Sequence, residues 1–324
     1  DLGSYKTYQA IKTEAEKHWK NFPAKPEYKE FSIHSTGSYI FQSKNCKECY
    51  EVIGAENSKF IFMCTYPGIK DCYDISSWGE NMELCYESVN CGENAYNLKF
   101  CLSGWEAASD SEYSILNHGS SNLFGCISVR NGEYAILNKK YSKKDYEKLK
   151  AKIVPHMDEM PYIDAKGRVY RYGEFFPIEL NPFAYNETAA QKFFPLTKEE
   201  ILEKGYVWRD PELRTYSITK SHKDLPDHIK DAPADILKET IGCAACGRGF
   251  KIIKMEFDFL RQMNLPLPRE CPFCRIDKKF NQWVKNLTLV KRICDKCGAE
   301  FETPHTKEDS KHILCKKCWL AEVV

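Results

Sequence analysis

Residues 72–88, CYDISSWGENMELCYES, repeat a cysteine–tyrosine–acid unit after thirteen residues. Short units of this kind recur throughout residues 43–141. Their aromatic residues are Tyr50, Phe60, Tyr73, Tyr86, Tyr96, Tyr113, Phe124 and Tyr134. Most steps between them are 10 to 13 residues, and the one long step contains Trp105. Gly, Asn, Ser and Glu fill the gaps, so the pattern predicts short strands of alternating character separated by turns.

Short strands at a small, nearly fixed period, with no helices between them, favour a β-solenoid. One coil cannot bury its own apolar face, whereas stacked coils bury a continuous column of side chains. A Greek-key sandwich is the alternative, but it needs longer strands and less regular spacing. We therefore expect a mainly β protein with a β-solenoid body and short helical caps.

Cysteines are spread through this repeat: Cys46, Cys49, Cys64, Cys72, Cys85, Cys91, Cys101 and Cys126. Cys46 and Cys49 have the C-x-x-C spacing of half a zinc site, but two further ligands are missing. Cys49 precedes a tyrosine, as Cys72 and Cys85 do. We therefore predict that these thiols pack inside the coils as small hydrophobic groups.

A different pattern follows the repeat. Ser142 resembles the N-cap of a helix that we expect to stop near Pro155 and to cap the solenoid. Thr197 opens a capping box, residues 209–232 have the composition of an exposed linker, and a short helix is expected over residues 234–240.

The C-terminal cysteines are arranged in two sets of paired C-x-x-C motifs. The first set is Cys243, Cys246, Cys271 and Cys274, and the second is Cys294, Cys297, Cys315 and Cys318. Four thiolates complete a tetrahedral zinc site, so we expect two structural Zn²⁺ ions with no open coordination position. Two alternatives remain, namely iron–sulfur ligation and pairing of the middle two motifs across the sets.

The tail is basic, because residues 243–324 carry 16 Lys and Arg against 10 Asp and Glu, whereas residues 1–242 carry 31 against 36. A helix after Cys274 is expected to interleave basic residues with Phe280 and Trp283. Basic residues beside aromatic ones favour RNA or DNA binding through phosphates and stacking. The candidate contacts are Arg275, Lys278, Lys279, Lys285, Lys291 and Arg292. A protein partner and a purely structural tail are the alternatives.

These patterns divide the chain into four parts. We expect an N-terminal helix and lead-in over 1–36, solenoid repeats over 37–141, a helical cap and connector over 142–242, and a tandem zinc domain over 243–324. The two zinc sites are expected within 243–286 and 287–324. The chain lacks an initial Met, so we expect a longer natural chain.

Residues 243–279 resemble a zinc-ribbon domain of the treble-clef type, which implies Cys243, Cys246, Cys271 and Cys274 as ligands. From about residue 37 onward, the chain resembles a family of uncharacterised zinc-ribbon proteins of candidate-phylum bacteria. The resemblance rests on the two zinc units and on residues 42–45, 83–87, 122–126, 135–139 with Tyr141, and 181–188. It implies a solenoid and zinc sites but no known activity.

Several functional classes have no support in the sequence. Phosphate-loop, zinc-protease and nucleophile-elbow motifs are missing from it. A carbohydrate-active solenoid would need clustered carboxylates, for which Asp71, Asp74, Glu83 and Glu87 are the candidates. We expect a non-enzymatic, cytoplasmic zinc protein, because reduced thiols suit that compartment and no stretch suggests a membrane span or an export signal. Its partner is expected to be nucleic acid or a ribonucleoprotein, with a protein scaffold acting through the solenoid face as the rival.

Overall fold

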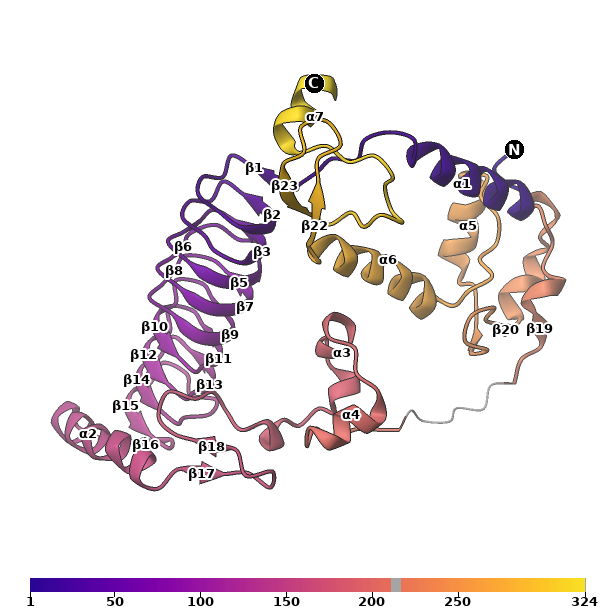
Figure 1. The fold of residues 1–324 in the computed structure, drawn as a ribbon. Helices are drawn as coiled ribbons and strands as arrows, with labels where there is room; N and C mark the ends of the chain where they lie inside the picture. The colour runs from indigo at the N-terminus through magenta and orange to yellow at the C-terminus, as the bar shows by residue number, and fades with distance from the viewer. Residues whose placement is uncertain (211–216, 324) are drawn as a thin grey trace. The chain divides into compact units, whose positions relative to one another are not determined.

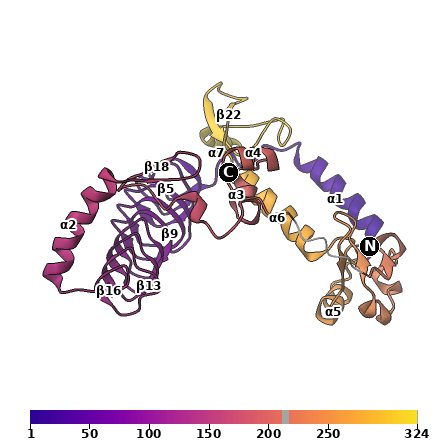
Figure 2. The ribbon, with the colours of Figure 1, turned by 90° about the horizontal axis from the view of Figure 1, so that it is seen from below.

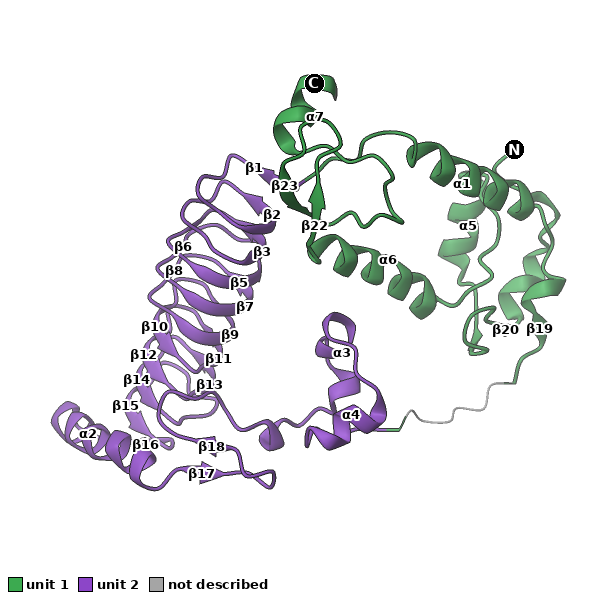
Figure 3. Cartoon of the chain, in the orientation of Figure 1, with its two compact units in different colours: residues 1–26, 210–324 green, residues 27–209 purple. Residues whose placement is uncertain are grey.

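The computed structural model describes residues 1–210 and 217–323. The chain divides into two compact units (Figure 3), one formed by residues 27–209 and the other by residues 1–26 together with 210–324. No helix in the described ranges is both long and apolar enough to cross a bilayer.

The unit of residues 27–209 is built on a parallel β-solenoid of about eight turns, which confirms the predicted fold (Figure 1). Its strands are β1 (Lys29–Glu30), β2 (Gly37–Phe41), β3 (Cys49–Ile53), β4 (Ala55–Glu56), β5 (Lys59–Cys64), β6 (Ile69–Lys70), β7 (Tyr73–Gly79), β8 (Met82–Glu83), β9 (Tyr86–Gly92), β10 (Tyr96–Lys99), β11 (Leu102–Trp105), β12 (Ser109–Glu112), β13 (Ile115–His118), β14 (Ser121–Phe124), β15 (Glu133–Ile136) and β16 (Lys139–Lys140). Stacked strands pair in parallel, and only the closing pair β15–β16 is antiparallel. Because β1 already pairs with β2, the coil hydrogen bonds begin before residue 37.

Burial in the coils recurs every third residue, and not every second as the alternating strands had suggested. The inward side chains of the first coils are Ile40, Ser43, Cys46, Cys49, Val52, Ala55, Ser58, Ile61 and Cys64, each at most 2% exposed. The residue before each of them has a positive φ. Each positive φ turns the chain, so each side of these first coils is three residues long and presents one side chain to the interior.

This three-residue period explains the C-x-x-C spelling at Cys46 and Cys49. Both thiols are fully buried, which confirms the predicted core packing. The Cys46 thiol donates to the carbonyl oxygen of Lys44, as the Ser58 hydroxyl does to that of Glu56. The strand register places Cys46, and not Cys49, in the column of Cys72 and Cys85, because Lys47 pairs with Lys59 and Lys59 with Tyr73.

An aromatic column runs along one corner of the solenoid. It contains Phe60, Tyr73, Tyr86, Phe100, Tyr113 and Phe124, with successive ring centroids 4.7 to 5.7 Å apart. Tyr96 and Tyr134, which the sequence pattern grouped with them, stand outside this column. The spacing along the column follows the coil length of 11 to 14 residues.

Helix α2 (Lys143–Glu159) contacts the end of the solenoid (Figures 1 and 2), as expected of a cap. Ser142 caps it by accepting from the backbone N–H of Asp145. The helix continues through Pro155, so its predicted stop was wrong by about one turn. Glu112, only 5% exposed, accepts hydrogen bonds from Lys150 at 3.0 Å and from the Tyr172 hydroxyl at 2.9 Å. This buried network fastens α2 and the following segment to the coils.

The rest of the solenoid unit is mostly irregular. Its elements are β17 (Tyr162–Ile163), β18 (Val169–Tyr170), η1 (Ile178–Leu180), η2 (Tyr185–Glu187), α3 (Ala190–Phe193) and α4 (Lys198–Glu203). The capping box at the start of α4 is confirmed, since Thr197 accepts from Glu200 N–H and the Glu200 carboxylate accepts from Thr197 N–H.

The second unit contains both groups of C-terminal cysteines. Its elements are α1 (Tyr5–Trp19), β19 (Lys220–Ser221), η3 (His222–Asp224), η4 (Ile229–Asp231), η5 (Ala234–Lys238), β20 (Ile241–Gly242), β21 (Gly249–Phe250), α5 (Lys254–Gln262), α6 (Pro272–Leu287), β22 (Val290–Ile293), β23 (Glu300–Thr303) and α7 (Lys316–Val323). The sequence suggested an exposed linker over 209–232, of which residues 211–216 lie outside the described residues. Leu225 and Ile229 contradict this for the remainder, because both are buried in the core around Cys243 and Cys271.

Candidate metal centres

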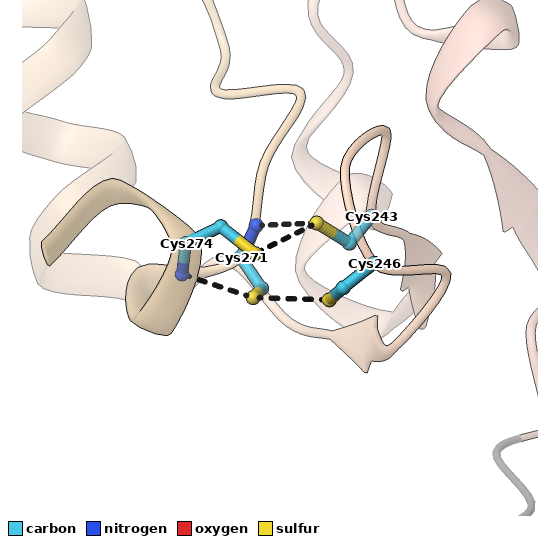
Figure 4. Close-up of side chains that lie close together, drawn as sticks. All are labelled: Cys243, Cys246, Cys271 and Cys274. Atoms are coloured by element: carbon cyan, nitrogen blue, oxygen red, sulfur yellow. Dashed lines mark hydrogen bonds between the residues drawn. The ribbon is translucent and has the colours of Figure 1, made fainter. Parts of the chain in front are cut away.

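The first centre gathers four cysteine sulfurs from two elements (Figure 4). Cys243 and Cys246 belong to the turn between β20 and β21, whereas Cys271 is the N-cap of α6 and Cys274 lies in its first turn. The Sγ atoms of Cys243 and Cys274 are 3.8 Å apart, as are those of Cys246 and Cys271. A tetrahedron with Zn–S bonds of about 2.3 Å has S···S edges of about 3.8 Å. The group therefore fits a tetrahedral metal ion.

The second centre repeats this arrangement with a different spacing between its motifs. Cys294 and Cys297 belong to the turn of the β22–β23 hairpin, and Cys315 and Cys318 lie at the start of α7. The Sγ atoms of Cys297 and Cys315 are again 3.8 Å apart. In both centres all four sulfurs lie within 4.8 Å of one another. The grouping is sequential, so the alternative pairing across the two sets is wrong.

Both turns have the same backbone geometry, which the sequence fixes with a glycine. Gly247 has φ +71° and donates to the Cys243 carbonyl, and Gly298 has φ +73° and donates to the Cys294 carbonyl. A residue with a side chain is strained at such a φ. The turn points both thiols of a C-x-x-C motif toward the same place.

Backbone N–H groups stabilise one thiolate in each centre. The N–H of Cys271 donates to the Sγ of Cys243, and the N–H of Cys315 donates to the Sγ of Cys294, both over 3.2 Å. Burial raises the pKa of Cys243 and Cys294, but these N–H groups and those of each turn outweigh it and lower both pKa values to about 6. Burial and hydrogen bonds with the other thiols raise the pKa of Cys318 to about 12 and also raise that of Cys274.

A cation bound among the four sulfurs would stabilise all four as thiolates. Four sulfurs at contact distance cannot all be anionic unless a positive charge lies among them. Four protein sulfurs also fill the tetrahedron and leave no position for water or substrate. Each centre could therefore hold one metal ion in a structural role, and its all-sulfur ligand set and geometry fit Zn²⁺.

The basic residues proposed from the sequence are mostly occupied by contacts within the unit. The ion pairs are Arg275 with Glu256 at 2.7 Å, Lys278 with Glu270, Lys285 with Asp309, and Lys291 with Glu300 at 3.3 Å. Arg292 donates to the carbonyl oxygens of His305 and Ser310, and so holds the loop before the last two cysteines. Of the six, only Lys279 is exposed without a described ion-pair partner.

Other exposed lysines of the tail were missed by the sequence reasoning. Lys307, Lys311 and Lys317 lie on the loop and helix that supply Cys315 and Cys318, and no ion pair with a described carboxylate involves them. Their sequence signal was present, because Lys311 precedes the last C-x-x-C motif by four residues and Lys317 lies within that motif.

The N-terminal helix also contributes to this unit, which no local pattern indicated. Ser4 donates to the Asp227 carboxylate at 2.5 Å, and the Arg269 guanidinium lies 4.8 Å from the Tyr5 ring centroid. Beyond α1, the Trp319 indole donates to the Pro23 carbonyl over 3.4 Å. The segment 1–26 therefore contacts the surroundings of both metal centres.

The four carboxylates considered for carbohydrate chemistry are not gathered into one group. Asp74 and Glu87 lie on successive coils, because Tyr73 pairs with Tyr86, and burial raises the pKa of both. Glu83 instead faces Lys70 at 3.9 Å on another side. Asp71 precedes the buried Cys72 at an exposed turn.

No family model matches this chain, and no protein of known annotation matches it either.

Proposed function

We propose that this chain is a non-catalytic protein with two structural Zn²⁺ ions, one in each Cys₄ centre. The observation that carries the proposal is the pair of sulfur groups with edges of 3.8 Å. Zinc binding by such a site is coupled to folding of the surrounding chain. Both centres would then keep the small C-terminal tail folded, and the surface of the tail would bind a partner.

We propose further that the tail binds single- or double-stranded nucleic acid. Lys307, Lys311 and Lys317 support this, because they are exposed around the second centre and no described carboxylate neutralises them. Lys279 adds a charge on α6. Lysines of this kind are available to phosphates without first breaking an internal ion pair.

A protein-interaction scaffold is the rival function, and the solenoid is consistent with it. The stacked coils present long faces of the kind that repeat proteins use to bind partners. We also propose a cytoplasmic location and membership in the family of zinc-ribbon proteins that the sequence resembles. The two functions can be distinguished by the salt dependence of binding. For a protein that contacts nucleic-acid phosphates, the logarithm of the binding constant falls linearly with the logarithm of the salt concentration.

The test is fluorescence anisotropy of labelled RNA and DNA with the zinc-loaded full chain, from about 50 to 200 mM salt. We expect binding that falls log-linearly with salt and is lost in K311E/K317E. The matched control is K143E/K144E, which makes the same change of charge on α2. Binding that is absent at low salt, or that both double variants weaken equally, would leave the scaffold as the better account.

A further inference from the structure

One corner of the solenoid departs from the regular coil. Val52 pairs with Cys64 twelve residues later, whereas Ala55 pairs with Ile69 fourteen residues later. Two extra residues are therefore inserted in the segment Thr65–Gly68. This segment is exposed, and it places the Tyr66 ring, 53% exposed, on the outside of the coil.

The next coil has an unusual backbone at the neighbouring position. Ser77, Trp78, Gly79, Glu80 and Asn81 all have positive φ values, between 49° and 100°. Elsewhere in the coils positive φ values occur singly or in pairs, so this run of five is a local departure, and such strain often accompanies a binding function. The register pairs Trp78 with Cys91, which is fully buried, yet Trp78 is partly exposed. The backbone therefore turns a tryptophan outward from a position that is inward on the next coil.

Two glycines beside this ring allow the backbones of adjacent coils to approach closely. Gly79 pairs with Gly92, and a Cβ on Gly92 would lie 3.5 Å from the Trp78 ring and 2.1 Å from the Gly79 carbonyl oxygen. Across Gly92, the rings of Trp78 and Trp105 meet edge to face with centroids 5.1 Å apart. Trp105 is fixed in turn, because its indole N–H donates to the Asn90 carbonyl at 2.6 Å.

These departures create an open pocket of about 450 Å³ beside the C-terminal ends of β5, β7 and β9. Its lining combines two aromatic rings, a thioether, three hydroxyls (one of them phenolic) and two carboxylates. The residues are Met63, Thr65, Tyr66, Ser77, Trp78, Glu80 and Glu93. No lysine or arginine lines the pocket, so its formal charge is negative.

Several carboxylates of the solenoid are paired with a lysine, whereas no such pair is described for the two in the pocket. Glu56 faces Lys44 at 4.0 Å, Glu83 faces Lys70 at 3.9 Å, and Glu112 faces Lys99 at 3.7 Å. Glu80 and Glu93 occupy equivalent places on successive coils, and neither forms an ion pair with a described residue. Two like charges on adjacent coils repel each other, and a bound cation would relieve that repulsion.

We propose that this pocket binds an organic ammonium ion. Aromatic faces attract a cation electrostatically, and the attraction is strongest for Trp. Alkylammonium groups also have apolar carbons, which suit Met63 and Tyr66, whereas a bare metal ion would gain nothing from them. The carboxylates of Glu80 and Glu93 supply the countercharge. The ammonium could come from a small free amine or from a lysine side chain of a peptide, and the chemistry is the same.

The experiment follows the indole N–H signals of the zinc-loaded full chain by NMR during titration with tetramethylammonium chloride at constant ionic strength. Trp78→Phe assigns the signal of interest. We expect a saturable shift of that signal, and no such shift with tert-butanol, which has nearly the same shape without the charge. An acetylated, amidated Gly-Lys-Gly peptide tests the second source. Tighter binding of the peptide assigns the site to lysine side chains, and equal binding assigns it to the cation alone.

Matched variants then locate the site. E80Q/E93Q and Tyr66→Ala should each weaken binding about tenfold. Glu106→Gln should leave it unchanged, because Glu106 continues the same column one coil further on but does not line the pocket. The absence of a saturable shift, an equal response to tert-butanol, or full binding by E80Q/E93Q would overturn the proposal. Since Glu80 and Tyr66 take no part in the tail, this result is independent of the test for nucleic-acid binding.

Discussion

The backbone N–H of Cys271 donates a hydrogen bond of 3.2 Å to the Sγ of Cys243. The second centre reproduces this contact between Cys315 and Cys294 at the same distance, although its motifs are separated by 17 residues and those of the first by 24. The chain between two motifs can therefore vary without altering the sulfur geometry. Because the two sites have the same geometry, each is expected to bind one metal ion.

Removal of metal should unfold the tail and spare the solenoid. We expect about two zinc ions per chain, one in each Cys₄ centre. Their removal should unfold the tail, because the apparent binding free energy of such sites, roughly 10 to 16 kcal/mol, contributes directly to the folding free energy. Hydrogen exchange after treatment with a chelator should show lost protection in α5 to α7 and retained protection in β2 to β14. Equal loss in both units would show that the solenoid also depends on the metal.

Replacing a cysteine by serine should have different effects on metal content in the two kinds of C-x-x-C motif. Cys271→Ser should remove one zinc per chain, whereas Cys46→Ser should leave the metal content unchanged. Serine already occupies the same column at Ser58 and makes the same contact with a carbonyl two residues back, so we expect Cys46→Ser to cost about 1 kcal/mol. Metal analysis and urea denaturation measure both effects. A loss of zinc in Cys46→Ser would contradict the core assignment.

Glu112 should be the most sensitive carboxylate of the solenoid. Its removal leaves Lys150 and the Tyr172 hydroxyl without their partner in a buried place, so Glu112→Ala should destabilise the unit by about 3 kcal/mol. Glu83→Ala is the control, because its pair with Lys70 is exposed and should contribute less than about 1 kcal/mol. Similar losses in the two variants would mean that the network does not fasten α2.

Asp227 should anchor the start of α1. Hydrogen bonds from the Ser4 hydroxyl and the Lys6 N–H lower the pKa of Asp227. Its contribution is therefore complete above the ordinary pKa of an aspartate and fades as the pH falls through the lowered value. Asp227→Ala should speed hydrogen exchange in α1 several-fold at neutral pH. Asp235→Ala, an exposed change nearby, should leave the exchange rates of α1 as they were.

Much of this structure could be predicted from the order of residues, but the period of burial could not. The thirteen-residue repeat at Cys72 and Cys85 predicted the solenoid, and the eight paired cysteines predicted both Cys₄ clusters. Alternation was expected because extended strands bury every second residue. Here a left-handed residue precedes each buried one, and residues such as Tyr39 and Glu51 adopt that conformation without a glycine to signal it.

Local sequence patterns also could not predict the partners of the basic residues. Lys285 and Asp309 are 24 residues apart, and only the fold of the second centre brings them together. The same holds for Ser4 and Asp227, which are separated by the whole solenoid unit. Spacing within a motif is visible in a sequence, whereas partners supplied by distant segments are not.

The second unit is formed by two segments that are far apart in the sequence, and this separation affects how the unit can assemble during synthesis. Residues 1–26 leave the ribosome before the solenoid, but their partners around Cys271 and Trp319 are translated only after it. At about 5 to 20 residues per second, α1 waits on the order of ten seconds or more for these partners. The coils meanwhile can form one after another on the nascent chain, since each needs only its predecessor. Assembly of the unit that contains the two Cys₄ centres can therefore be completed only after the solenoid and the segment up to Trp319 have been synthesised.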